Sequence, residues 1–356
     1  MDTLLFSIII PVYNRPDELK ELLDSLVQNR ELKSAVTDVA LDADNGIIGD
    51  QAAAFGMEVI VVEDGSRIRS KEVCDLYSSH LDLHYLYQEN TGPAGARNNG
   101  ARVARGEWLL FFDSDCLIPP GFFEAVMGGI TSEKPDFFGG PDRASDDFTP
   151  VQKAIDYAMT SFLTTGGIRG GRRRLDRYYP RSFNKGVRKE AYDAVGGFSA
   201  LRFGEDLDLS MRLMKAGYRS VLIPDAWVYH KRRTDLKKFF KQVYNSGMAR
   251  VVLNRLHPGT MKGLHLLPSF FVVYLLLAVA MLPAGHLFLL WPLLLFILAL
   301  FAHGWSHTRS FSAALLVPPA SLVQLSGYGS GLWHALFLIY LLGRKEARAF
   351  EKTFYK

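Results

Sequence analysis

Apolar runs of strand length alternate with helical patterns over the first two thirds of the chain. Four such runs cover residues 6–13, 58–62, 83–87 and 108–112. After the first run, leucines recur at the spacing of one helix face: Leu19, Leu22, Leu23 and Leu26. Strands that alternate with amphipathic helices predict βαβ units around a mostly parallel sheet, so the fold class is α/β.

Polar side chains follow these apolar runs. Asn14, Asp64, Asn90 and Asp113 come at or just after the ends of the four runs. The carboxyl ends of parallel strands share one edge of a sheet, where α/β proteins bind ligands, so we expect a polar site there. For Asn14 or Asn90 taken alone, the simpler interpretation as a turn residue would suffice.

Two carboxylates one residue apart, Asp113 and Asp115, follow the apolar run Trp108–Phe112. At a strand end, one carboxylate can hold a hard divalent cation while the other binds a ligand hydroxyl. Chance alone gives roughly four acidic pairs with this spacing in a chain with 37 acidic residues. The pair is therefore informative only because it ends a buried strand, where it indicates a site for a metal-bound diphosphate.

The segment 31–57, between the first helix and the second strand, is longer than a simple connection requires. Its Asp42–Gly46 stretch differs from a calcium loop, because Gly46 stands at the fifth position and no Glu stands at the twelfth. We interpret this segment as a solvated insertion.

Composition narrows the class of protein. The net charge of +4 is too small to indicate nucleic-acid binding. The two cysteines, Cys74 and Cys116, form neither a disulfide framework nor a zinc pattern, which favours a reducing compartment.

The C-terminal third carries long apolar segments. Leu264–Leu282 and Leu287–Ala302 are nearly uncharged and long enough to span a bilayer. A third region, Phe311–Leu342, is interrupted by Pro318-Pro319 and by the glycines of 327–331, which leaves two short helices or one span plus a re-entrant piece as alternatives.

Basic residues flank these apolar segments and set the predicted topology. They cluster in 231–263 before the first span and in 344–356 after the last. Both ends are therefore expected on the cytoplasmic side, with two or four crossings of the inner or plasma membrane between them. The predicted domains are a catalytic domain over 1–230, a basic membrane-proximal segment over 231–263, a transmembrane region over 264–343 and a cytoplasmic tail over 344–356.

Five motifs occur in a fixed order along the predicted catalytic domain. They are Pro-Val-Tyr-Asn at 11–14, Val-Glu-Asp-Gly-Ser at 62–66, Gly-Ala-Arg-Asn-Asn-Gly at 95–100, Asp-Ser-Asp at 113–115 and Gly-Glu-Asp-Leu-Asp-Leu at 204–209. In this order they resemble glycosyltransferase family 2, inverting enzymes of the GT-A fold. Glu63 departs from the Asp that is common in the family.

The resemblance implies a role for each matched residue. The nucleotide side of the donor would be bound through Pro11, Tyr13, Asp64, Arg97 and Asp113. Asp115 would ligate Mn²⁺ or Mg²⁺, with His230 as a further metal or diphosphate contact, and Asp206 would be the catalytic base. Without the resemblance, each of these residues has a simpler interpretation. Arg97 could be a surface arginine and His230 a core histidine. Glu205-Asp206 could be the acidic start of a helix.

The chemistry of inversion agrees with these assignments. A single displacement requires a cation on the leaving diphosphate and a base at the attacking hydroxyl. Asp206 stands at the predicted start of helix 205–216, where the helix dipole favours an ionised carboxylate. Arg172, Arg173 and Arg174 could hold an acceptor phosphate or belong to a solvated loop.

The sequence thus predicts a membrane-anchored, metal-dependent glycosyltransferase of cell-envelope glycan biosynthesis with a cytoplasmic catalytic domain. It would move one sugar from a nucleotide-diphospho-sugar, UDP-sugar being favoured, to a lipid-linked or glycan acceptor. A processive polysaccharide synthase is the alternative, but no Arg-Trp pair follows Gln242. A silent nucleotide-sugar-binding protein would be expected to lack Asp115 or Asp206, and the absence of a GxGxxG run opposes a dinucleotide dehydrogenase.

Overall fold

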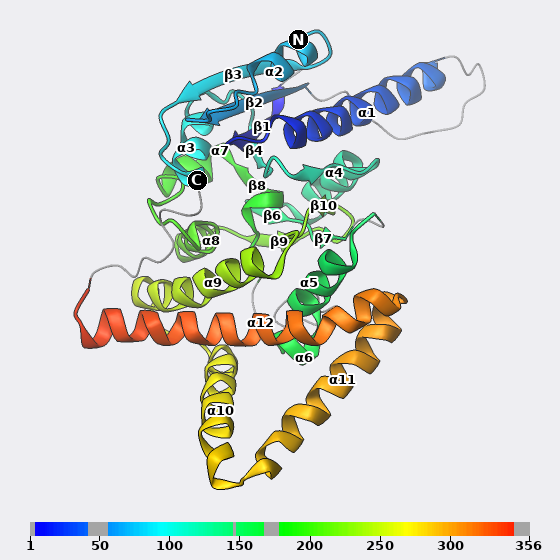
Figure 1. Cartoon of the computed structure of the whole chain (residues 1–356). Helices are drawn as coiled ribbons and strands as arrows, with labels where there is room; N and C mark the ends of the chain where they lie inside the picture. The colour runs from blue at the N-terminus through cyan, green and yellow to red at the C-terminus, as the bar shows by residue number, and fades with distance from the viewer. Residues whose placement is uncertain (1–3, 42–55, 145–146, 167–177, 345–356) are drawn as a thin grey trace. The chain divides into compact units, whose positions relative to one another are not determined.

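The computed structural model describes residues 4–41, 56–144, 147–166 and 178–344, and over 30–41 the backbone alone. These residues divide into two compact units (Figure 1). Unit 1 comprises 1–143 and 178–231, and unit 2 comprises 144–177 and 232–356. Unit 1 therefore does not include the described residues 147–166, which belong to the predicted catalytic domain 1–230 and are part of unit 2. Three segments named in the sequence analysis lie outside the described residues: the Asp42–Gly46 stretch, the arginines at 172–174 and residues 345–356 of the predicted tail.

A seven-stranded sheet forms the centre of unit 1. Its strand order is β3-β2-β1-β4-β8-β6-β9. In this order the strands are Asp82–Gln88, Gly56–Asp64, Leu4–Val12, Trp108–Phe111, Lys185–Arg188, Phe137–Gly139 and Ser220–Leu222. The first four strands pair in parallel, and β8 runs antiparallel to both β4 and β6. The predicted mostly parallel sheet is confirmed.

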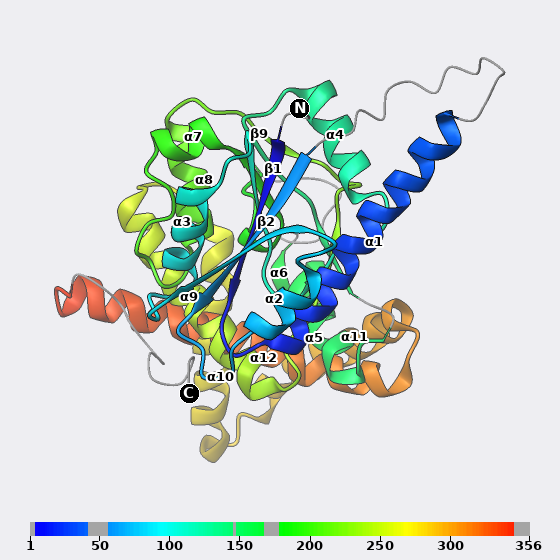
Figure 2. The same cartoon turned by 90° about the horizontal axis from the view of Figure 1, so that it is seen from above.

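Helices cover both faces of this sheet (Figure 2). They are α1 (Pro16–Leu41), α2 (Lys71–Tyr77), α3 (Pro93–Val103), α4 (Phe122–Glu133), α7 (Lys189–Ala194) and α8 (Glu205–Lys215). Side chains alternate along β1, so Ile8 and Ile10 pack into the core that contains the α1 leucines, whereas Ile9 packs with Ala96 of α3 and Leu209 of α8. The sheet thereby fixes the starts of α3 and α8 relative to the strand ends.

The helix α1 is longer than predicted. Leu19, Leu22, Leu23 and Leu26 are fully buried, as their spacing indicates. The helix then continues to Leu41, so residues 31–41 are helical rather than part of a loop. Its continuation has a simple cause, since neither proline nor glycine occurs between residues 31 and 41.

A second, three-stranded sheet was not predicted. Its order is β5-β10-β7, with β5 at Cys116–Leu117, β10 at Val228–His230 and β7 at Asp142–Arg143. The register places His230 opposite Cys116. Residues far apart in the chain thus meet immediately after Asp115.

Unit 2 is helical. It contains α5 (Pro150–Thr160), α6 (Phe162–Thr165), α9 (Leu236–Leu256), α10 (Leu267–Met281), α11 (Trp291–Thr308) and α12 (Phe311–Leu336). The helices α9 and α12 lie side by side along much of their length (Figure 1). Glycines permit this approach, because a Cβ on Gly331 would lie 2.0 Å from the carbonyl oxygen of Tyr244 and one on Gly247 would lie 2.1 Å from that of Tyr328.

The predicted break in the third apolar region is wrong. α12 continues through Pro318 and Pro319 and through the glycines of 327–331. Pro318 and its neighbours Val317 and Ala320 are buried, so tertiary packing stabilises a helix that local propensity disfavours. Among the described helices, two are long and apolar enough to cross a bilayer, Gly263–Ala284 and Leu287–Thr308, each with a mean hydropathy of 2.3.

We expect Gly186→Ala to destabilise unit 1. A Cβ at Gly186 of β8 would lie 2.2 Å from the buried ring of Phe138, which must move or force the strand aside. Overpacking of this kind costs about 1–3 kcal/mol, measurable as a lower urea midpoint followed by tryptophan fluorescence. Gly128→Ala is the matched control, because its added Cβ meets nothing within 4 Å. Equal midpoints for the two variants would contradict this packing.

Candidate active site

A buried arginine joins three segments at the carboxyl edge of the sheet. Arg97 of α3 is only 3% exposed. It donates to Asp113 Oδ1 at 2.6 Å and to Glu205 Oε1 at 3.2 Å. Burial opposes the charge on Arg97, but Asp113 and Glu205 together raise its pKa above the ordinary value. The interpretation of Arg97 as a surface arginine is therefore wrong.

The start of α8 presents Asp206 in an ionised form. One of its oxygens accepts a 2.7 Å hydrogen bond from the backbone of Leu207, and the other lies 3.2 Å from Arg181 Nη1. Burial tends to raise the Asp206 pKa, but the charges of Arg181 and Lys185 bring it below the ordinary value. The carboxylate is thus able to accept a proton at neutral pH.

Lys185 was missed by the sequence analysis. Its side chain is fully buried in unit 1, where Nζ donates to the Asp206 carbonyl at 2.7 Å and to Ser210 Oγ at 3.0 Å. Burial lowers its pKa to about 7. The only sign of its burial in the sequence is its place between Phe183 and Val187, in a segment of strand character. Lys185 links the sheet to the first turns of α8.

Asp115 and His230 face each other after the β4 end. His230 Nε2 lies 3.4 Å from Asp115 Oδ1, and the imidazole stacks on Phe183 with ring centroids 4.7 Å apart. Arg15 Nη1 lies 2.5 Å from the other oxygen, Oδ2. Burial would raise the Asp115 pKa, but His230 and Arg15 hold it well below its usual range.

The Asp115–His230 pair fits a divalent cation. Asp115 Oδ1 is buried, and His230 Nε2 faces it. Two adjacent ligands of an octahedral Mg²⁺ or Mn²⁺ lie about 3 Å apart, close to the observed 3.4 Å separation. Cys116 is near enough to join them, but burial raises its thiol pKa well above the ordinary value, which opposes the thiolate a metal needs. Asp115 and His230 are therefore the residues that could hold the metal.

The predicted nucleotide residues lie at the same edge. Asp64 is buried and accepts from the backbone of Thr91 at 2.8 Å and of Gly92 at 2.9 Å, so it ties the end of β2 to the start of α3. Pro11 pairs with Val62 in the sheet, and Tyr13 follows β1; both are partly exposed.

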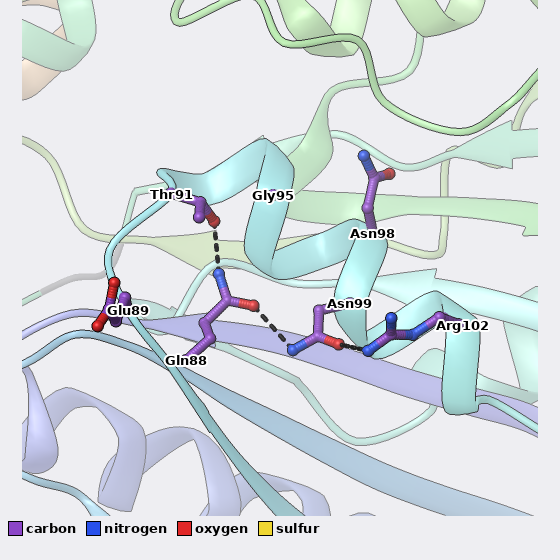
Figure 3. A pocket seen from close by; sticks show the side chains of 7 residues that line it. All are labelled: Gln88, Glu89, Thr91, Gly95, Asn98, Asn99 and Arg102. Atoms are coloured by element: carbon purple, nitrogen blue, oxygen red, sulfur yellow. Dashed lines mark hydrogen bonds between the residues drawn. The ribbon is translucent and has the colours of Figure 1, made fainter.

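A pocket lies along α3 and the end of β3 (Figure 3). It is lined by Gln88, Glu89, Thr91, Gly95, Asn98, Asn99 and Arg102. Gln88 connects it to the candidate site by donating to Asp64 at 2.7 Å and to Thr91 at 2.6 Å. None of the predicted site residues, all of them described, lines this pocket. The candidate site therefore consists of the charged cluster of Arg97, Asp113, Glu205 and Asp206, together with the Asp115–His230 pair.

Comparison with known proteins identifies two overlapping family matches. Residues 7–205 match the model described as glycosyl transferase family 2, and residues 108–305 match that of glycosyl transferase family group 2. The chain is 31% identical over 215 residues to a pre-mycofactocin glycosyltransferase of Mycobacterium tuberculosis, covering 57% of this chain and 43% of the relative. It is 29% identical over 219 residues to an uncharacterized glycosyltransferase of Haemophilus influenzae, covering 59% and 62%. The chain thus spans less than two thirds of each relative.

A solved structure shows the fold. The mannosyltransferase PcManGT of Pyrobaculum calidifontis, in complex with GDP-Man and Mn²⁺, superposes with a TM-score of 0.60 at 17% identity, covering 90% of this chain and 87% of that one. The predicted GT-A fold is confirmed.

The pKa of Glu205 predicts a pH-dependent stability. Burial and the adjacent Asp206 raise it from 4.5 to about 7. The folded protein then binds this proton more tightly than the unfolded chain, so the free energy of unfolding should fall as pH rises through that interval. Glu205→Gln removes the titration and should flatten the fall between about pH 5 and pH 8, measured by urea unfolding.

Glu107→Gln serves as the control for this measurement, because Glu107 is exposed and its loss should preserve the wild-type slope. Equal slopes for Glu205→Gln and wild type would contradict the raised pKa.

Proposed function

Because the chain belongs to glycosyl transferase family 2, we propose that it transfers a sugar from a nucleotide-diphospho-sugar to an acceptor hydroxyl with inversion. The observation that carries this proposal is the placement of Asp206 at the start of α8, where it accepts from Leu207 N–H and Arg181. The adjacent Glu205 is joined through Arg97 to Asp113, just after β4. We propose that the base and the nucleotide side of the donor meet at this cluster.

Asp206 takes the proton of the acceptor hydroxyl as that oxygen forms its bond to the sugar and the bond to the diphosphate breaks. Arg181 and Lys185 keep Asp206 ionised before this step. Asp115 and His230 would hold Mn²⁺ or Mg²⁺, which would counter the charge of the leaving diphosphate. Arg97 was predicted to bind the nucleotide, but it is buried and donates to Asp113 and Glu205, so we propose that it orients these two residues instead.

The donor class is supported by PcManGT, whose complex contains GDP-Man and Mn²⁺. We propose that Pro11, Tyr13, Asp64 and Asp113 bind the nucleotide here. A UDP-sugar is the first donor to test, and a lipid-linked glycan is the proposed acceptor.

The proposed acceptor class rests on the apolar hairpin α10–α11 of unit 2. Large side chains along both helices are exposed, among them Leu276 at 66% and Leu298 at 54%. Soluble proteins rarely expose so continuous an apolar surface. We infer that the hairpin inserts into the inner or plasma membrane with the catalytic unit on the cytoplasmic side.

Two substitutions should separate metal binding from chemistry. Asp206→Asn should leave UDP affinity within a few fold and lower turnover by roughly 10² or more, as expected for loss of a general base.

Asp115→Ala should abolish the Mn²⁺-dependent part of UDP affinity. Calorimetric titration and donor turnover measure the two effects, with exposed Asp193→Asn as control. Undiminished Mn²⁺-dependent affinity in Asp115→Ala, or near wild-type turnover in Asp206→Asn, would refute the respective role.

Lysines on the hairpin should weaken membrane attachment. In Leu276→Lys/Leu298→Lys, each charge would face the hydrocarbon core at a cost of about 3 kcal/mol. Flotation with phosphatidylglycerol-containing vesicles should then recover much less protein, while UDP affinity stays unchanged. Leu76→Lys is the matched control, since Leu76 is 67% exposed in unit 1. If wild-type protein does not float, the membrane proposal fails and a soluble glycan becomes the better acceptor.

A further inference from the structure

The guanidinium of Arg15 lies on the carboxylate assigned to the metal. Its Nη1 is 2.5 Å from Asp115 Oδ2, while His230 Nε2 faces Oδ1 of the same group. The Arg15 side chain is 35% exposed and that of Asp115 is 12% exposed. Arg15 is therefore partly open to solvent and contacts one oxygen of the candidate metal ligand.

The backbone that presents Arg15 is held firmly. Asn14 adopts φ 54°, a left-handed conformation that asparagine tolerates better than most residues. Its Oδ1 accepts from the backbone of Arg67 at 2.7 Å and of Ile68 at 3.1 Å, and its own N–H donates to Ser66 Oγ at 2.8 Å. Arg15 thus extends from a fixed point between β1 and α1.

We propose that Arg15 couples metal binding to donor binding. It holds Asp115 in the metal-free protein and opposes a divalent cation there until a diphosphate brings negative charge to the site. This inference rests on the proposed metal-dependent function.

The coupling follows from charge. A guanidinium and a divalent cation that share one buried carboxylate repel each other, and burial weakens the screening of that repulsion by water and salt. A diphosphate removes the conflict, because its oxygens can accept from the arginine fork and ligate the metal at the same time. Arg15 should therefore weaken Mn²⁺ binding in the absence of nucleotide and strengthen it in the presence of nucleotide.

The test measures Mn²⁺ binding rather than activity. Free Mn²⁺ is followed by electron paramagnetic resonance as the full chain in detergent is titrated with Mn²⁺ alone, with Mn²⁺ and UDP, and with Mn²⁺ and pyrophosphate, which carries no nucleobase. Because UDP and pyrophosphate themselves chelate Mn²⁺, the same titrations without protein are subtracted. Arg15→Met removes the charge and keeps the aliphatic stem, and Arg15→Lys keeps the charge without the fork. Arg219→Met is the matched control, because Arg219 pairs with Glu133 at the opposite, amino-terminal edge of the sheet.

In wild type, UDP or pyrophosphate should tighten Mn²⁺ binding strongly. In Arg15→Met we expect tighter binding of Mn²⁺ alone and a UDP enhancement reduced by about 10-fold, within the usual range of coupling between two sites. Arg15→Lys should keep the weak binding of Mn²⁺ alone and lose part of the enhancement, and Arg219→Met should match wild type.

Two results would overturn this inference without affecting the proposed function. Arg15→Met could show the same coupling as wild type, or it could bind Mn²⁺ more weakly than wild type in the absence of nucleotide. The second result would mean that Arg15 only positions Asp115. Wild type that binds no Mn²⁺ even with pyrophosphate would overturn the proposed metal dependence as well. Should Arg15→Met fail to fold by circular dichroism, Arg15→Gln makes the same change of charge.

Discussion

The pairing of Arg97 with two carboxylates is the interaction on which the candidate site depends. A guanidinium that is 3% exposed is tolerated only if its charge is compensated nearby. Its partners come from separate segments, Asp113 after β4 and Glu205 at the start of α8. Loss of a buried charge partner typically costs about 3–5 kcal/mol. This pairing therefore stabilises the arrangement in which α3, the segment after β4 and the start of α8 meet at Arg97.

That arrangement also divides the roles of the two adjacent acids of α8. Glu205 has its pKa raised to about 7, foremost by burial, whereas Asp206 has its pKa lowered by Arg181 and Lys185 against the same burial. Adjacent carboxyl groups whose environments push their pKa values apart are typical of acid–base sites. Glu205 is thus suited to a structural pairing with Arg97, and Asp206 to proton transfer.

Much of unit 1 could be predicted from the sequence, because its signals are local. Apolar runs predicted the parallel strands, and the polar residues after them predicted the edge of the sheet at which Asp64 and Asp113 lie. Arg15 and Lys185 could not be identified in this way, since their importance comes from contacts with Asp115 and Asp206 at large separation in the chain. For α12, buried packing outweighed the breaks that Pro318 and Pro319 indicated.

The two proposed metal ligands illustrate the limit of local signals. His230 belongs to a strand of only three residues, whose register places it opposite Cys116, next to Asp115. Because side chains alternate along a strand, a slip by one residue would turn His230 to the other face and remove it from Asp115. The register is fixed by a hydrogen bond from Lys231 N–H to the Asp115 carbonyl at 3.2 Å and by the stacking of His230 on Phe183. A site that fits a divalent cation is thus assembled by tertiary contacts that no short stretch of the chain encodes.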